Sequence, residues 1–141
     1  MYLSPPSVMD TLSPAERSER MSRVRSRDTK PELAARRLVY SMGYRYRLYG
    51  RLPGRPDMVF SGRRKVIFVH GCFWHRHRGC PNCRMPKSNL KFWRRKFEGN
   101  RQRDQVNRNR LRRLGWGVLV IWECELNDTI LLAQRIRKFL T

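Results

Sequence analysis

The most apolar run in the chain is Trp116-Gly117-Val118-Leu119-Val120-Ile121-Trp122, and such a run predicts a strand that is buried on both faces. It is preceded by a second apolar run, Lys65-Val66-Ile67-Phe68-Val69-His70. Between the two lies a long basic helix, which the sequence predicts from Ser88 to Gly115. Since a helix that separates two apolar strands forms a crossover, we expect these strands to pair in parallel.

Two more strands are predicted ahead of these runs. Residues 57–60 are short and apolar, and the Ser61-Gly62 turn joins them to residues 65–70 as a hairpin. Residues 44–49 alternate with a period of two, which predicts a further strand before the hairpin. Three consecutive strands are therefore expected between residues 44 and 70.

Helices are predicted on both sides of these strands. Thr29-Lys30-Pro31-Glu32 has the spacing of a capping box and begins a helix that ends at Gly43. Asn127 or Asp128 caps a last amphipathic helix. The fold class is therefore α/β, a mixed β-sheet flanked by helices in the order α-α-β-β-β-α-β-α.

The chain is expected to form one domain behind a short tail. Residues 1–12 show no apolar periodicity and are predicted to be a disordered tail, whereas residues 13–141 form the single domain. Its first helix, residues 13–26, is nearly all polar, with Met21 and Val24 as its sizeable apolar residues. A helix of this kind buries little of itself. It also carries four arginines, at residues 17, 20, 23 and 25, whose charge suits the phosphates of a nucleic acid, so we expect it to lie on DNA.

The charge of the chain indicates a polyanionic partner. Lys and Arg number 32 against 11 Asp and Glu in 141 residues, a formal net charge of +21. Nucleic acid neutralises such an excess, and four Trp, five Tyr and six Phe offer surfaces on which bases can stack. No stretch approaches the roughly 18 apolar residues of a membrane span, and no export signal is evident. We therefore expect a cytoplasmic protein that associates with the nucleoid when it binds DNA.

Cysteine and histidine residues gather in one segment, which predicts a structural zinc site. The spacing Cys72-x4-His77-x2-Cys80 supplies three ligands from one loop. Cys124 is the candidate fourth ligand, because it follows one buried strand as Cys72 follows the other. Cys83 competes with Cys80, and the spacing leaves that choice open. A closed shell of four ligands would hold the loop rather than take part in chemistry.

Asp57 is the candidate ligand for a hard catalytic cation such as magnesium. It follows the rigid segment Leu52-Pro53-Gly54-Arg55-Pro56 at the start of a short strand, where its carboxylate would be fixed. The predicted hairpin returns the chain to place His70 near Asp57. Cleavage of a phosphodiester needs a cation, a proton acceptor and a means to place both in line.

The predicted order of elements resembles that of the restriction-endonuclease-like nucleases. Most of those carry an acidic residue and a lysine on the second strand, where this chain has Phe68-Val69-His70. Leu52-Pro53-Gly54-Arg55-Pro56-Asp57, His70-Gly71-Cys72-Phe73-Trp74-His75 and the run from Gly115 to Cys124 together resemble the very-short-patch-repair DNA mismatch endonucleases. The resemblance covers about residues 14–126.

This resemblance implies roles for particular residues. Asp57 and the main-chain carbonyl of Val69 would bind magnesium, and His75 would be the general base. His70 and Glu32 would organise the water around the metal, although Glu32 is also explained by the capping box alone. Among the zinc ligands, the family spacing favours the set Cys72, His77, Cys80 and Cys124.

The resemblance also implies a DNA-binding surface. Three aromatic side chains would insert into the base stack beside the mismatch, one apolar side chain would enter the minor groove, and three polar side chains of the long helix would contact DNA around the mismatch. The aromatic side chains are those of Phe73, Trp74 and Trp93, and the apolar side chain is that of Met21. The polar side chains of the long helix are those of Lys96, Asn100 and Asp104.

The implied function is a magnesium-dependent endonuclease that nicks one strand 5′ to the thymine of a T:G mismatch and so begins repair of deaminated 5-methylcytosine. Its substrate would be double-stranded DNA, and we expect a monomer that has a mismatch-repair protein as a partner. Two alternatives stay open: a zinc-bound nucleic-acid-binding module without catalysis, and a nuclease of the same fold with a different DNA target.

Overall fold

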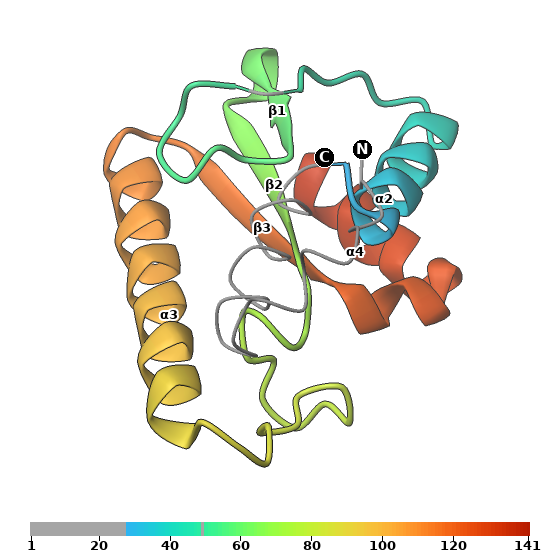
Figure 1. Ribbon diagram of the computed structural model, residues 1–141. Helices are drawn as coiled ribbons and strands as arrows, with labels where there is room; N and C mark the ends of the chain where they lie inside the picture. The colour runs from blue at the N-terminus through green and yellow to red at the C-terminus, as the bar shows by residue number, and fades with distance from the viewer. Residues whose placement is uncertain (1–27, 49) are drawn as a thin grey trace, which may run out of the picture.

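A three-stranded sheet lies between helices on both of its faces in the computed structural model, which describes residues 28–48 and 50–141 (Figure 1). The helices are α2 (Lys30–Ser41), α3 (Leu90–Arg113) and α4 (Thr129–Leu140), with short 3-10 turns η2 (Ser61–Arg63) and η3 (Glu123–Asn127). The strands are β1 (Met58–Phe60), β2 (Lys65–His70) and β3 (Gly117–Trp122).

The sheet is mixed, and its order is β1-β2-β3. β1 and β2 form the predicted antiparallel hairpin, in which Met58 pairs with Ile67. β2 and β3 run parallel over their full length, from Lys65 beside Gly117 to His70 beside Trp122. The predicted crossover is therefore confirmed, and it brings the carboxyl ends of β2 and β3 to the same edge of the sheet.

Side chains that alternate along the strands build one core on each face of the sheet. Ile67 and Val69 of β2 pack with Ile121 against α2 and α4. Val66 and Phe68 face the other way and pack with Leu111 of α3. Figure 1 shows the same layers, with α3 on one side of the sheet and α2 and α4 on the other.

Glycine ends two of the helices as the sequence predicts. Gly43 follows α2 with a φ of +96°, and Gly115 follows α3 with a φ of +91°. After α3 the amide of Trp116 donates to the carbonyl of Leu111 at 2.9 Å, and the amide of Gly115 donates to Arg112 at 3.0 Å. This Schellman arrangement turns the chain directly into β3.

The prediction of a strand at residues 44–49 is wrong. Among the described residues 44–48, Arg47 alone pairs, through two 2.9 Å bonds with Val59, which form an isolated bridge. β1 has three residues, so it offers little edge for a longer ladder. The alternating pattern instead reflects partial burial, because Tyr44, Tyr46 and Leu48 pack against the α2 and α4 core.

Two other details differ from prediction, and one open alternative is resolved. β3 is predicted to be buried on both faces, but it lies at one edge of the sheet, and Ile121 is its one buried residue. α3 begins after Asn89 rather than Ser88, and Asn89 takes a left-handed conformation that its short polar side chain tolerates. At α4 the alternatives are resolved, since the Asp128 side chain accepts from the amide of Leu131 at 3.1 Å.

The predicted tail at residues 1–12, the helix at 13–26 and Met21 lie outside the described residues. Within residues 28–48 and 50–141, no helix combines the length and apolar character that crossing a membrane requires.

Candidate active site and metal centre

A cleft of about 620 Å³ opens where β2 ends. Its walls come from the start of α2, the loop before β1, the end of β2 with the loop after it, and one face of α3. Three predicted site residues line this cleft, namely Asp57, His70 and His75. The hairpin and the crossover therefore bring three predicted site residues to one place.

Asp57 is held at the cleft by the neighbouring strand. Its Oδ2 accepts a hydrogen bond from the backbone amide of Val69 at 2.6 Å. Burial raises the pKa of Asp57 above its ordinary value, the bond from Val69 opposes this, and the charge of Glu32 raises it again. The carboxylate is thus costly to ionise unless a positive charge lies beside it.

Glu32 belongs both to the helix cap and to the cleft. The amide of Glu32 donates to Thr29 Oγ1 at 3.4 Å, which confirms Thr29 as the cap. The Glu32 carboxylate accepts from the amide of Asp28 and the hydroxyl of Thr29, each at 2.9 Å, and not from the Thr29 amide that a full capping box would use. It is 7% exposed, and it acts on Asp57 by charge and by a side-chain hydrogen bond. Two carboxylates side by side provide the hard oxygen ligands that Mg²⁺ prefers.

A second set of groups, His75, Asp104 and His70, lies on the α3 side of the cleft. His75 Nδ1 lies 2.6 Å from Asp104 Oδ2. The rings of His70 and His75 stack with centroids 3.9 Å apart. The atoms of His70, His75 and Asp104 that could bind a metal all lie within 4.8 Å of one another. The pair of His75 and Asp104 has the geometry in which a carboxylate orients an imidazole.

Electrostatics separate the two histidines. Burial, and then the proximity of His75, lower the pKa of His70 to about 3. Burial would raise the pKa of Asp104, but the hydrogen bond and charge of His75 outweigh it and lower the pKa. His70 therefore stays neutral beside an ionised Asp104 over the physiological pH range.

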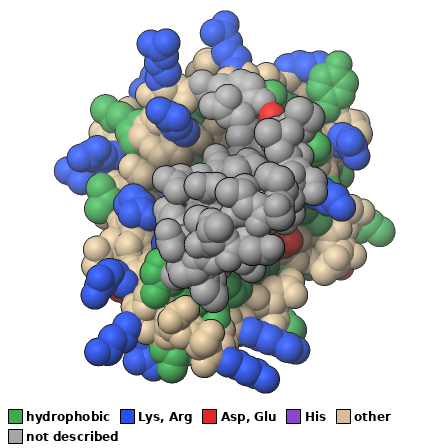
Figure 2. Space-filling view, viewed as in Figure 1, with side chains coloured by type: hydrophobic (Ala, Val, Ile, Leu, Met, Phe, Trp, Pro, Cys, Tyr) green, Lys and Arg blue, Asp and Glu red, His purple; other side chains and the backbone are tan. Residues whose placement is uncertain are grey.

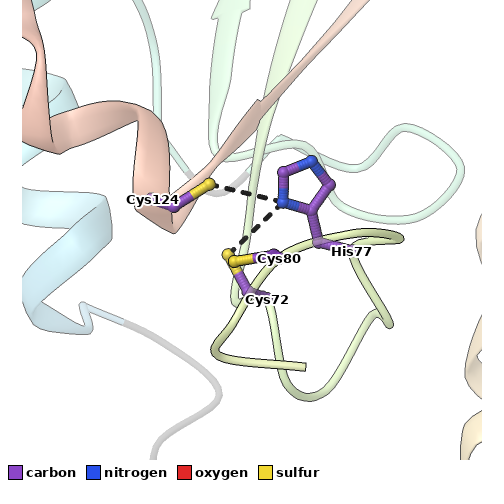
Figure 3. A group of neighbouring side chains, drawn as sticks. All are labelled: Cys72, His77, Cys80 and Cys124. Atoms are coloured by element: carbon purple, nitrogen blue, oxygen red, sulfur yellow. Dashed lines mark hydrogen bonds between the residues drawn. The ribbon is translucent and has the colours of Figure 1, made fainter. Parts of the chain in front are cut away.

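The predicted zinc ligands Cys72, His77, Cys80 and Cys124 come together at the other side of the same loop. Their ligand atoms lie within 4.8 Å of one another. His77 Nδ1 is 3.7 Å from Cys72 Sγ and 3.3 Å from Cys124 Sγ. Figure 3 shows Cys72, Cys80 and His77 on the loop after β2, and Cys124 reaching them from the turn after β3.

These distances fit a tetrahedral zinc ion. Zinc–sulfur bonds of about 2.3 Å and zinc–nitrogen bonds of about 2.0 Å place neighbouring ligands roughly 3.5–3.8 Å apart. Burial raises the pKa of the Cys72 thiol, so a bound cation would be needed to hold it as a thiolate. Cys83 is outside this group among the described residues, which favours Cys80 over Cys83.

Comparisons with known proteins identify the family of this chain. The family model described as DNA mismatch endonuclease Vsr matches residues 9–82. The chain belongs to the Vsr family. Membership makes it a DNA endonuclease and confirms the resemblance seen in the sequence.

Vsr relatives match nearly the whole chain. The type II nicking enzyme V.XorIIP of Xanthomonas oryzae is 52% identical over 94% of this chain and 98% of that protein. V.NmeAIP of Neisseria meningitidis is 38% identical, over 93% of this chain and 94% of that protein. The DNA mismatch endonuclease Vsr of Escherichia coli is 42% identical, over 84% of this chain and 76% of that protein.

The aromatic residues expected to enter DNA form one cluster in this Vsr chain. Phe73 lies 5.0 Å from Trp74 and 5.6 Å from Trp93, measured between ring centroids. Phe73 and Trp74 are half-buried, whereas Trp93 is 9% exposed and packs on Phe97. Phe73 and Trp74 therefore offer surface to a ligand, and Trp93 supports them from behind.

The polar residues expected to contact DNA follow one face of α3. Lys96, Asn100 and Asp104 are spaced four residues apart and all line the cleft. Asn100 donates to the carbonyl of Trp74 at 3.0 Å, which ties the helix to the aromatic cluster. Asp104 is committed to His75, so the structure gives it a partner that the sequence did not suggest.

Sequence reasoning missed three contributors to the Vsr site. Trp122 stacks on His77 with ring centroids 4.3 Å apart and so orients the imidazole toward the cysteines. Glu123 accepts from the amide of Cys72 at 3.3 Å, and Arg108 lines the cleft. Adjacency to Cys124 is the signal that could have identified Trp122 and Glu123.

Proposed function

We propose that this protein nicks one strand of double-stranded DNA 5′ to the thymine of a T:G mismatch, with a divalent magnesium ion, and leaves a 5′-phosphate. The observation that carries the proposal is the His75–Asp104 pair, which lies in the same cleft as the paired carboxylates of Asp57 and Glu32. A proton acceptor and a cation site on one cleft are what phosphodiester hydrolysis requires.

His75 is the general base of the proposed reaction. Because Nδ1 donates to Asp104, Nε2 is left as the acceptor that can take a proton from water. Asp104 holds the ring in this tautomer and stabilises the imidazolium that forms. His70 stays neutral and stacks on His75, so it fixes the position of the base without adding a competing charge.

Asp57, Glu32 and the main-chain carbonyl of Val69 would hold the magnesium ion. When bound, the ion supplies charge neutralisation at the phosphate and at the leaving oxygen. Asp57 is already oriented by its bond to the backbone of Val69. The raised pKa of Asp57 supports this role, since its carboxylate lies where a positive charge is needed.

Zinc is proposed at Cys72, His77, Cys80 and Cys124, where it would tie the loop that carries His75 to the end of β3. His75 lies between two of these ligands in the sequence. A four-ligand site leaves no position for water, so its contribution is to hold the loop. The half-buried Phe73 and Trp74 of the same loop would insert beside the mismatch, where base pairing is already weak.

The positive charge supports duplex DNA as the ligand. Lys and Arg side chains stand around the rim of the face in Figure 2. The finer parts of the proposal, namely the mismatch, the monomeric state and a mismatch-repair partner, rest on membership of the Vsr family.

The decisive experiment is nicking of end-labelled duplexes of identical flanking sequence, each with one mismatch or none, in the presence of magnesium. We expect one cut, 5′ to the thymine, in the T:G duplex. Asp57→Ala and His75→Ala should abolish the cut while DNA binding persists, and Arg78→Ala, an exposed residue of the same loop, should leave it unchanged. Equal cutting of matched duplexes would contradict mismatch specificity, and no cutting of any duplex would favour a binding module.

A further inference from the structure

Arg108 continues the stripe of polar residues on α3. Lys96, Asn100, Asp104 and Arg108 follow one another at intervals of four, and all of them line the cleft. Intervals of four keep side chains on one helix face. The stripe therefore ends at Arg108, one helical turn beyond Asp104, and the proposed function gives Arg108 no role.

The turn of α3 that carries Arg108 is fixed against the catalytic residues. Asp104 lies one turn earlier and bonds to His75 at 2.6 Å. Asn107 packs against Gly54, so closely that a Cβ on Gly54 would lie 3.0 Å from the Cβ of Asn107. Gly54 belongs to the loop that leads into Asp57. The turn of α3 that carries Arg108 is thus fixed both to His75 and to the loop before Asp57, and Arg108 lines the same cleft as both residues.

The charge of Arg108 is available to a ligand. Its Nη2 donates to the neutral side chain of Gln105 at 3.0 Å. Within the part of the chain that the structure describes, no carboxylate forms an ion pair with it. Its charge nevertheless reaches the site, since it helps to lower the pKa of both His70 and Asp104.

Hydrolysis of a phosphodiester builds negative charge on the non-bridging oxygens of the phosphate. A fixed cation aimed at these oxygens stabilises the transition state more than the ground state. A guanidinium suits this task, because its donors match two phosphate oxygens at once.

The geometry points to Arg108 as the residue that binds the phosphate to be cleaved and stabilises its transition state. The ligand class is a DNA phosphodiester in the cleft, and this inference rests on the proposed function. It separates Arg108 from the other arginines of α3, which are exposed and do not line the cleft.

The test compares Arg108→Ala with Arg110→Ala in the full-length, zinc-loaded protein. Both changes remove one positive charge from α3, but Arg110 is exposed and does not line the cleft. At saturating protein with magnesium, we expect Arg108→Ala to slow single-turnover nicking of the T:G duplex about 100- to 1000-fold, on the scale of losing one transition-state donor. Arg110→Ala should change that rate less than about 3-fold, and Arg108→Lys should restore part of it.

A second readout locates the contact without relying on the rate. Equilibrium binding is measured without magnesium, to a duplex with a neutral methylphosphonate at the position where the wild-type protein cuts. Neutralisation should weaken binding of the wild type and of Arg110→Ala, and weaken binding of Arg108→Ala much less. Thermal melting of each variant shows whether it is folded.

The outcomes are distinct. If the wild type nicks but Arg108→Ala and Arg110→Ala behave alike in both assays, the inference is overturned and the proposed function stands. If the wild type nicks no duplex, the proposed function fails, and this inference fails with it.

Discussion

At the scale of single residues, the site works by pairing groups that would be unfavourable alone. The buried carboxylate of Asp57 is influenced by the charge of Glu32, and a cation beside it would stabilise its ionised form. The Asp104 carboxylate is instead paired with an imidazole. The two aspartates have opposite pKa shifts, so in the proposed reaction they would take different tasks, one toward the metal and one toward the base.

Asp104 should be needed for catalysis more than for DNA binding. Asp104→Asn keeps the shape of the side chain but removes the charge that orients His75 and stabilises its protonated form. We expect single-turnover nicking to slow by about 10²-fold, within the usual range for general-base catalysis. Glu98→Gln is the matched control, because it neutralises an exposed acid of the same helix. Equal rates for the two variants would refute the dyad.

His70 should make the protein sensitive to acid. Its pKa is about 3 in the folded state, against 6.5 ordinarily. Below pH 6.5 the unfolded chain takes up a proton at His70 and the native state does not. The contribution of His70 to the free energy of unfolding is therefore fully present above pH 6.5 and is lost as the pH falls toward 3. The loss approaches about 1.4 kcal/mol per pH unit.

The measurement is urea unfolding at pH 6.5, 5.5 and 4.5 for the wild type and for His70→Phe. The phenylalanine keeps an aromatic ring in this buried position but cannot titrate. The variant should lose less stability across this range than the wild type. Parallel curves would show that His70 does not carry the acid sensitivity.

At the scale of elements, short rigid connections place the site. The loop from Leu52 to Pro56 delivers Asp57 to the cleft, and its position against α3 depends on Gly54. This glycine has a φ of +77° and lies against Asn107. A side chain at residue 54 would therefore meet both a strained backbone and a filled space.

Gly54→Ala should destabilise the protein by about 1–3 kcal/mol, the usual cost of strain at such a position. It should also slow nicking, because the loop that carries Asp57 would move away from α3. Gly62→Ala is the control, since a Cβ there meets nothing within 4 Å and the φ of Gly62 is not in the left-handed region. Unfolding in urea and nicking rates are compared for both, and equal stability of the two variants would argue against this account.

At the scale of the whole molecule, one parallel strand pair connects both halves of the site. β2 ends in His70 and leads into the loop that carries His75 and His77, and β3 ends beside Cys124. Zinc would close this arrangement by joining segments about fifty residues apart in sequence. Its removal should therefore affect the entire fold rather than one loop.

Cys124→Ser should lower zinc content and the free energy of unfolding, by about 3 kcal/mol if zinc is present at about 100 times its dissociation constant. Chelation of the wild type should lower the melting temperature in the same way. Cys83→Ser is the matched control, because Cys83 lies outside the four-residue cluster, and it should keep both zinc and stability. Zinc loss from Cys83→Ser but not from Cys124→Ser would require a different ligand set.

Local sequence by itself determined the N-terminal caps of α2 and α4, the hairpin, the crossover and the cysteine spacing. These features depend on neighbours in the chain or on hydrophobic periods, and Thr29, Gly115 and Asp128 all act as predicted. The alternating pattern of residues 44–49 led to the wrong prediction of a strand. Such alternation indicates which side chains are half-buried, but it does not show whether a partner strand of sufficient length lies beside them.

Only the tertiary structure decided which side chains meet. The bond from Asp104 to His75, the charge of Glu32 on Asp57 and the choice of Cys80 over Cys83 each join segments whose approach depends on packing around the sheet. A sequence gives the order and period of its elements, but distances between side chains on different elements follow from how the cores on the two faces fill. For that reason many residues of this site could be named from the sequence, whereas Trp122, Glu123 and Arg108, and the contacts between side chains, could not.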